Sequence, residues 1–350
     1  MNPQDKTPQS SLTAAGASEL TKAALAADVI PDRLSPGSKR RLGRSSFSLK
    51  RGNMSAVDLI EAINLHDKSQ KAQIEEVRKK ELPNLENLSP AELREKCRFG
   101  TFTRTTVGLC LGYVQANLVV LPKAFAYDFL LLCTRNKQSC PLLHVCDAGS
   151  PIPGHLAPTA DLRKDLPGYV VYRHGVASER LTDISHLWNE DSVAFLIGCS
   201  FSYDGAFQKK KLPNRAASAG RNVPMYRTSV PVRPAGIFDR GTVVVSMKPI
   251  PSDRVAEEVR LTSRFPHAHG PPLAVGSGRS IGVEDIYSPD FGEAPLPLEG
   301  DDVPIFHACG VTPQSVLMAC GENIPIAITH APGKMFVTDI LAEDFEDYIQ

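Results

Sequence analysis

The spacing of apolar positions changes along the 350-residue chain. Residues 1–52 are rich in Ser, Pro, Ala and Gly and lack a sustained apolar period, so we predict a disordered tail. Residues 53–86 space their apolar positions as a helix does, among many charges, and predict a helical lead-in. From 87 to 343, short apolar runs alternate with helical stretches, which predicts one folded domain, followed by an acidic tail at 344–350.

Within this domain, runs rich in β-branched and aromatic residues predict strands, and stretches with helical spacing predict helices. The predicted strands are Tyr169–Arg173, Ser192–Cys199, Thr242–Met247, Ile324–Thr329 and Met335–Ile340. The predicted helices are Lys123–Arg135, Tyr203–Lys211, Asp253–Ser263 and Pro313–Cys320. Another helix should follow Ser89, because Ser89-Pro90-Ala91-Glu92 matches a capping box with proline at the first helical position. Strands and helices mixed in this order predict an α/β (mixed α+β) fold.

Composition narrows the class of protein. Lys plus Arg and Asp plus Glu number 39 each, so no net field would steer nucleic acid or a membrane surface to the molecule. The eight cysteines form no CxxC pair, and the first thirty residues lack a signal-peptide pattern, which predicts free thiols in a reducing compartment. The longest charge-free apolar stretch, Val107–Pro122, contains two amides and is too short to span a bilayer. We therefore expect a soluble protein.

The segment 37–54 carries six basic residues and no acidic one. Such a segment suits a solvated tail, a localisation signal or part of an organellar presequence. Acidic residues upstream of it argue against a clean mitochondrial presequence. We expect a cytoplasmic protein, with the mitochondrial matrix as the alternative.

Cys199 and Cys309 share one sequence arrangement. Each ends an apolar strand-like run, and each precedes small polar groups and a predicted helix. Free N–H groups at such a helix start favour a carboxylate and would lower a thiol pKa. Ser200 follows the first cysteine, and Thr312 is the predicted N-cap after the second. The alternative is that both cysteines are small buried hydrophobic residues.

Two further groups of polar residues are candidate ligand contacts. Gln115 and Asn117 lie two apart in a strand-like run, so they share a face and need partners, either backbone or ligand. In the segment 220–228, arginines bracket an amide and a phenol, and arginine suits bidentate capture of a carboxylate. This segment reads as too polar for a core strand, and a structural salt-bridge loop is the alternative. The segment belongs to one of two proline-rich stretches, 213–236 and 266–297, which we predict to be long loops.

A metal site is not predicted. His267 and His269 form a His-x-His pair, but no cysteine or carboxylate flanks it at the usual spacing. The glycine-rich run 276–282 lacks the Lys-Ser/Thr ending of a phosphate loop.

Six segments, taken in order, resemble the signature blocks of the D-glutamate cyclase family, whose bacterial members are usually labelled as proposed hydro-lyases. They are GLCLGYVQANLVVLP, FLIGCSFS, RNVPMYRT, TSRFPHAHG, FHACGVTPQ and ITHAPGKMFVTD. The resemblance covers about residues 87–343 and implies a two-lobed α/β domain with sheets flanked by helices. It implies reversible loss of water from D-glutamate to give 5-oxo-D-proline.

The chain departs from the family pattern at several positions. Members commonly carry an acidic residue at His144, a glutamate at Asp204, a tryptophan at His307 and a histidine at Lys334. Animal members also have a second, C-terminal domain. These differences leave open which residue is acid, which is base, and whether the shared domain alone is catalytic.

Lactam formation requires a general base, a general acid, oxyanion donors and cations for a dicarboxylate. His330 stands where the resemblance puts a histidine, at a strand-to-turn boundary, and is the candidate proton carrier near neutral pH. Asp339 would orient it or would only cap backbone groups. The predicted catalytic residues are His330, Asp204, Cys309 and Cys199. The predicted substrate-binding residues are Gln115, Asn117, Ser200, Arg221, Asn222, Tyr226, Arg227 and Thr312.

Two other functions remain open. A non-enzymatic small-acid binding protein would use the same arginines and helix ends without a titrating pair. A cysteine-dependent amidohydrolase would act through Cys199 or Cys309. We expect no cofactor, a small dicarboxylate as the partner, and leave a homo-oligomer open.

Overall fold

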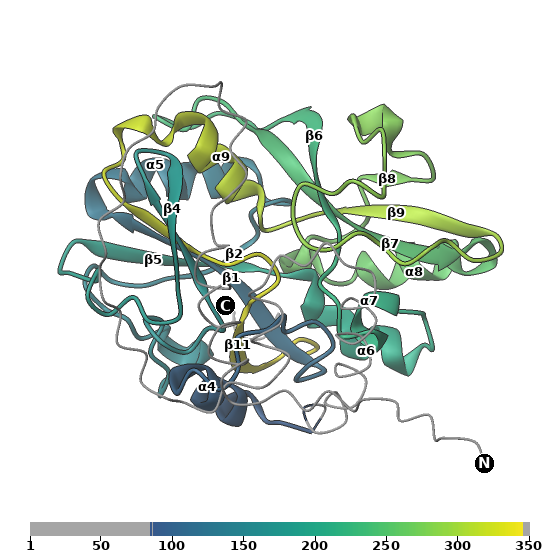
Figure 1. Cartoon of the computed structure of the whole chain (residues 1–350), viewed down its shortest axis with the longest axis horizontal. Helices are drawn as coiled ribbons and strands as arrows, with labels where there is room; N and C mark the ends of the chain where they lie inside the picture. The colour runs from purple at the N-terminus through teal and green to yellow at the C-terminus, as the bar shows by residue number, and fades with distance from the viewer. Residues whose placement is uncertain (1–84, 86, 346–350) are drawn as a thin grey trace, which may run out of the picture. The chain divides into compact units, whose positions relative to one another are not determined.

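The computed structural model describes residue 85 and residues 87–345, which all belong to one compact unit (Figure 1). The predicted tail at 1–52 and nearly all of the predicted lead-in at 53–86 lie outside the described residues, as does most of the predicted tail at 344–350.

A seven-stranded antiparallel sheet forms the larger part of this unit. Its order is β2-β5-β1-β10-β3-β4, and β11 pairs with β1 beside β10. Its strands are β1 (Tyr113–Pro122), β2 (Leu142–Val145), β3 (Tyr169–Arg173), β4 (Val176–Leu181), β5 (Ser192–Gly198), β10 (Ala327–His330) and β11 (Phe336–Leu341).

A second, four-stranded antiparallel sheet has the order β6-β7-β9-β8. Its strands are β6 (Met225–Pro231), β7 (Thr242–Pro251), β8 (Ala274–Val275) and β9 (Asp302–Ala308). The segment 225–231 is therefore a strand, although the sequence predicts a loop there. Its polar side chains fit because β6 lies at the sheet's edge and alternates buried with exposed positions over most of its length.

Helices flank both sheets (Figure 1). The α-helices are α4 (Pro90–Arg98), α5 (Lys123–Arg135), α6 (Asp204–Lys209), α7 (Arg215–Ser218), α8 (Val255–Thr262) and α9 (Thr312–Cys320). The short 3-10 helices are η2 (Gly154–Leu156), η3 (Ser200–Tyr203), η4 (Ser252–Arg254), η5 (Pro266–Ala268), η6 (Gly278–Ile281) and η7 (Gly321–Asn323). The capping box at the start of α4 forms as predicted, with Ser89 and Glu92 satisfying each other's backbone N–H groups.

The period-two alternation of β1 places its side chains in two apolar clusters. Ala116, Leu118 and Val120 belong to the first cluster, whereas Val119 and Leu121 belong to the second. Both clusters continue onto the four-stranded sheet. In that sheet, the even-numbered face of β7 also carries Ser246 and Lys248, both of which are buried. The strand alternation thus places polar groups where the two sheets share a core.

The expected mixed α/β fold class is confirmed. The predicted boundaries of β3 and α5 match the structure, and β5 is one residue shorter than predicted. Among the described residues, no helix combines the length and apolarity needed to cross a membrane.

Candidate functional site

The two side-chain amides of β1 bind groups within the protein, most of them backbone carbonyls. The Asn117 Nδ2 atom donates to the carbonyl of Gly198 at 2.6 Å and to that of Ile197 at 3.2 Å. The Gln115 Nε2 atom donates to the Leu109 carbonyl at 3.0 Å, and its Oε1 atom accepts from the Thr106 hydroxyl at 2.7 Å. The sequence left open whether these amides bind backbone groups or a ligand. The structure shows backbone partners for both, and contact with substrate stays a prediction.

The segments around the two cysteines meet. Cys199 and Cys309 belong to one apolar cluster that also contains Val311 and Met335. Gly310 packs against the amide of Asn117 so closely that a Cβ atom there would lie 1.9 Å from its Nδ2 atom. This contact joins the end of β9 to β1 and β5. Three of the six segments that carry the family resemblance, GLCLGYVQANLVVLP, FLIGCSFS and FHACGVTPQ, therefore lie together.

Desolvation raises the pKa of both thiols above its ordinary value. Desolvation raises the pKa of Cys309 to about 12, and it raises the pKa of Cys199 further. The expectation that helix starts would lower these pKa values is therefore wrong, because the loss of water outweighs the nearby N–H groups. Both side chains are protonated thiols at neutral pH.

The helix starts also differ from the prediction. The chain after Cys199 first forms η3, in which Ser200 is buried, and the six-residue α6 begins only at Asp204. Thr312 is the first residue of α9 and not its N-cap. Its hydroxyl donates to the Cys309 carbonyl at 2.7 Å and accepts from the Val244 N–H at 3.0 Å. Thr312 therefore braces the turn against β7.

Asp204 is fully enclosed and has three donors around it. Its Oδ1 atom accepts from Lys248 Nζ at 3.1 Å and from Asn214 Nδ2 at 2.8 Å, and its Oδ2 atom accepts from the Gly108 N–H at 3.3 Å. Desolvation raises the pKa of Asp204, and the Lys248 charge opposes that rise. The result is a buried carboxylate–ammonium pair that can exchange protons over one hydrogen bond.

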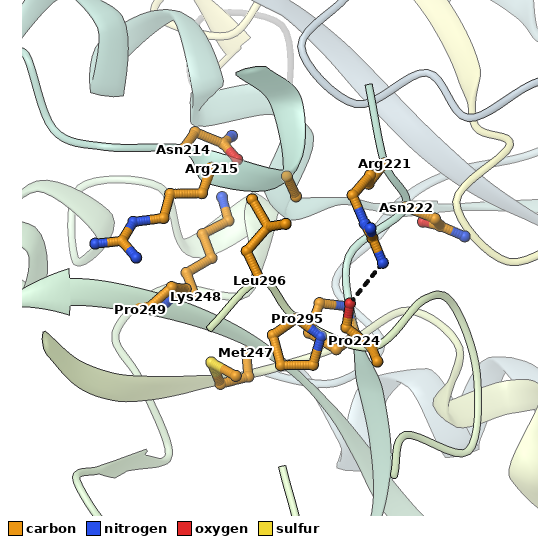
Figure 2. A pocket seen from close by; sticks show the side chains of 12 residues that line it. Asn214, Arg215, Arg221, Asn222, Pro224, Met247, Lys248, Pro249, Pro295 and Leu296 are labelled. Atoms are coloured by element: carbon orange, nitrogen blue, oxygen red, sulfur yellow. Dashed lines mark hydrogen bonds between the residues drawn. The ribbon is translucent and has the colours of Figure 1, made fainter. Parts of the chain in front are cut away.

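A pocket opens beside this pair (Figure 2). Figure 2 shows Lys248 on one side of Leu296 and Arg221 on the other, and the Arg221 guanidinium donates to the Ala294 carbonyl at 3.0 Å. Arg215 also lines the pocket, and no carboxylate is among the described lining residues. Arg221 and Arg215 bind Glu293 and Asp302 respectively. The lining cations suit a carboxylate ligand.

Lys248 and Asn214 are functional candidates that the sequence analysis missed. Both line the pocket and bind Asp204. A lysine inside the apolar strand Thr242–Pro251 is the signal that could have identified the first of them, because an isolated buried lysine needs a partner. Asn214 lies in an irregular segment that carried no comparable signal.

The two arginines of the segment 220–228 lie in different surroundings. Arg221 lines the pocket, whereas Arg227 is exposed, lies over the Phe291 ring and is not among the lining residues. The Tyr226 hydroxyl donates to the Ile286 carbonyl at 2.5 Å. Asn222 reaches the pocket edge, but its Nδ2 atom donates to the Pro332 carbonyl at 2.9 Å. Asn222 thus ties the pocket to the turn at 331–333.

His330 is completely buried in β10. Its Nδ1 atom lies 3.3 Å from the backbone nitrogen of Leu118 and 3.3 Å from the carbonyl oxygen of the same residue. Burial lowers its pKa to about 4. Asp339 pairs instead with Arg94 at 2.8 Å. The expectations of a cleft-facing imidazole near neutral pH and of an orienting Asp339 are therefore not met, and a catalytic role for His330 stays untested.

The His-x-His pair is enclosed as well. His269 Nδ1 lies 2.7 Å from the Gln138 carbonyl, and burial lowers the pKa of His269 to about 4. In the part of the chain that the structure describes, no group of three or more His, Cys, Asp or Glu side chains is arranged to hold a metal ion.

Comparison with known proteins places these elements in a family. Residues 193–339 match the family model described as D-glutamate cyclase. A proposed hydro-lyase of Bacillus velezensis is 50% identical over 260 residues, which are 74% of this chain and 97% of that protein. The chain belongs to the D-glutamate cyclase family. A proposed hydro-lyase of Nocardioides sp. is 51% identical over 253 residues, 72% of this chain and 92% of that protein.

The part matched by the D-glutamate cyclase family model contains Asp204, Lys248 and Arg221, whereas β1 with its two amides precedes it. Among solved structures, a nitrogen repressor-like protein of Methanococcus jannaschii aligns at 14% identity and a TM-score of 0.29, covering 61% of this chain and 80% of that one. So low a TM-score supports no conclusion about fold or function.

Proposed function

We propose that this member of the D-glutamate cyclase family is a hydro-lyase that reversibly dehydrates D-glutamate to 5-oxo-D-proline. The observation that carries the proposal is the buried Asp204–Lys248 pair, whose lysine lines a pocket together with Arg215 and Arg221. The family model and the names of the relatives support the reaction class. The partner is a small dicarboxylate.

The reaction moves two protons. The amine nitrogen of glutamate forms a bond to its own γ-carboxyl carbon, and one carbon–oxygen bond of that carboxyl breaks. An ammonium and a carboxylate become a lactam N–H, so both departing protons end on the leaving oxygen as water. The site must therefore take protons from nitrogen and return them to oxygen.

Lys248 lines the pocket and Asp204 lies behind it, so protons pass between the substrate and Asp204 through Lys248. Burial raises the pKa of Asp204, which makes it a better proton acceptor than an exposed aspartate. Lys248 polarises the γ-carboxyl group and donates toward the leaving oxygen. Arg221 holds the α-carboxylate, and holding both ends of a folded dicarboxylate supplies orientation, a large part of the rate advantage in an intramolecular reaction.

The raised thiol pKa values at Cys199 and Cys309 disfavour the cysteine-dependent amidohydrolase, because a thiol nucleophile attacks as the thiolate. A small-acid binding protein would use the same pocket cations but would not turn its ligand over.

The test is to incubate the purified protein with D-glutamate and with L-glutamate and to measure 5-oxoproline by chiral chromatography. We expect product from the D-enantiomer, and Arg221→Gln should raise KM by about tenfold or more because it loses a charged carboxylate contact. Arg227→Gln tests the sequence prediction that this exposed residue binds substrate, which requires a raised KM. Arg233→Gln, at another exposed position, is the control and should leave KM unchanged. Absence of 5-oxoproline with retained glutamate binding would establish the binding protein instead.

A further inference from the structure

Glu258 of α8 and His307 of β9 form a second buried pair near the site. Both side chains are at most 1% exposed, and His307 Nε2 lies 2.7 Å from Glu258 Oε1. Neither residue lines the pocket. A buried pair of this kind contributes little to stability by itself, so its presence calls for a role.

The hydrogen bonds fix how His307 is held. Its Nδ1 atom lies 3.3 Å from the Gly270 carbonyl, which can only accept, so Nδ1 carries a hydrogen. The 2.7 Å separation of Nε2 and Glu258 Oε1 is also that of a hydrogen bond, so two hydrogen bonds lock the imidazole ring in one orientation.

The locked ring contacts Tyr203. The ring centroids of His307 and Tyr203 lie 6.1 Å apart, and Tyr203 also stacks on Phe207 at 5.3 Å. The Tyr203 hydroxyl is buried without a hydrogen-bond partner in the described structure, although the Ser200 side chain lies near it. Contacts with the rings of His307, Phe207 and Phe265 hold the Tyr203 ring in place.

Lys248 rests on these rings. Its Nζ atom lies 4.5 Å from the centroid of Tyr203 and 4.7 Å from that of Phe207, while it binds Asp204. Strand register places His307 opposite Ser246 and Ile305 opposite Lys248, so His307 and Lys248 occupy the same face of the sheet. A chain of contacts runs from Glu258 through His307 and Tyr203 to the ammonium at the pocket.

We propose that Glu258 and His307 are positioning residues that hold the Tyr203 ring under Lys248 and so aim its ammonium at Asp204 and the pocket. The proposal rests on the proposed function only for its kinetic consequence. Among the described residues, Tyr203 faces both members of the pair, and His269 lies beside His307.

The decisive variant is Glu258→Leu with His307→Leu. Replacing a buried ion pair with apolar residues usually keeps or raises stability, so the melting temperature should not fall. Without the locked imidazole, kcat for D-glutamate should drop about ten- to hundredfold, as expected for misplacement of a catalytic group, while KM stays within about twofold. The single variant Glu258→Gln can still hydrogen-bond His307, so it should keep most of the kcat that the double leucine variant loses.

A second readout does not depend on turnover. In protein carrying 13C-labelled lysine, ring currents of Tyr203 and Phe207 should shift the Lys248 methylene signals upfield, with Lys248→Met providing the assignment. The double leucine variant should move these signals toward the position of an exposed lysine. Unchanged signals, or unchanged kcat in a folded double variant, would overturn the proposal. If no protein turns over glutamate but the signals move, the positioning stands and only the proposed reaction fails.

Discussion

Single buried residues hold the charges that the proposed chemistry uses. Asp204 and Lys248 are each only 3% exposed, and each would remain as an uncompensated buried charge if the other were removed. Asp204 could be selected from the sequence, because the family resemblance puts a glutamate at that position. Lys248 could not be selected as its partner, because that pairing joins residues 44 positions apart.

Two buried histidines make stability depend on pH. Burial lowers the pKa of His330 and His269 to about 4, whereas each would titrate near 6.5 in the unfolded chain. Below pH 6.5 these histidines are protonated in the unfolded chain but stay neutral in the folded protein. The free energy of unfolding should therefore fall as the pH drops from 6.5 to 4. Each histidine contributes up to about 3 kcal/mol to that fall.

Urea unfolding of the unmodified protein and of His330→Gln, from pH 7 to pH 4.5, checks this prediction. The variant should lose clearly less stability on acidification, and His186→Gln, at an exposed position, should behave like the parent protein. An identical slope in all three proteins would show that His330 is not held neutral by burial. The sequence alone could not predict this, because a histidine at a strand end has the same pattern whether its side chain faces solvent or core.

Elements meet where small residues permit it. Gly310 follows β9 and lies against Asn117 of β1, which in turn holds the end of β5. Gly310→Ala should expel the Asn117 amide and lower the free energy of unfolding by about 2 kcal/mol or more, since the amide's buried hydrogen bonds break as well.

A double-mutant cycle tests that contact. Asn117→Ala alone should cost about 1–3 kcal/mol, and the combination with Gly310→Ala should cost at least about 1 kcal/mol less than the sum, because the clash disappears with the amide. Additive losses in urea unfolding would mean that the two residues do not press on each other.

Regular elements with strong local patterns were predictable. The bounds of α5 and β3 follow from apolar spacing alone, and α4 begins at its capping box. β6 was not predictable in the same way, because as an edge strand it turns Arg227 and Ser229 outward and so looks like a polar loop. Local patterns therefore specify elements best where both faces of a strand are buried.

At the scale of the molecule, the two sheets share continuous apolar clusters, and the candidate site lies where their polar residues enter that shared core. The family resemblance gave the order of the blocks but not which of them line one pocket. That depends on long-range register, such as the pairing of β7 with β9 that places Lys248 and His307 on one face.

Exchange of oxygen with solvent tests the proposed reaction without relying on product accumulation. D-glutamate is incubated with the protein in 18O-enriched water, recovered, and analysed by mass spectrometry with fragmentation that separates the two carboxyl groups. Reversible dehydration replaces a γ-carboxyl oxygen at each cycle, so we predict 18O in the γ-carboxylate, none in the α-carboxylate beyond the protein-free control, and much slower labelling with Lys248→Met. Recovered D-glutamate without 18O, from protein shown to bind it, would contradict the assignment of this pocket as a hydro-lyase site.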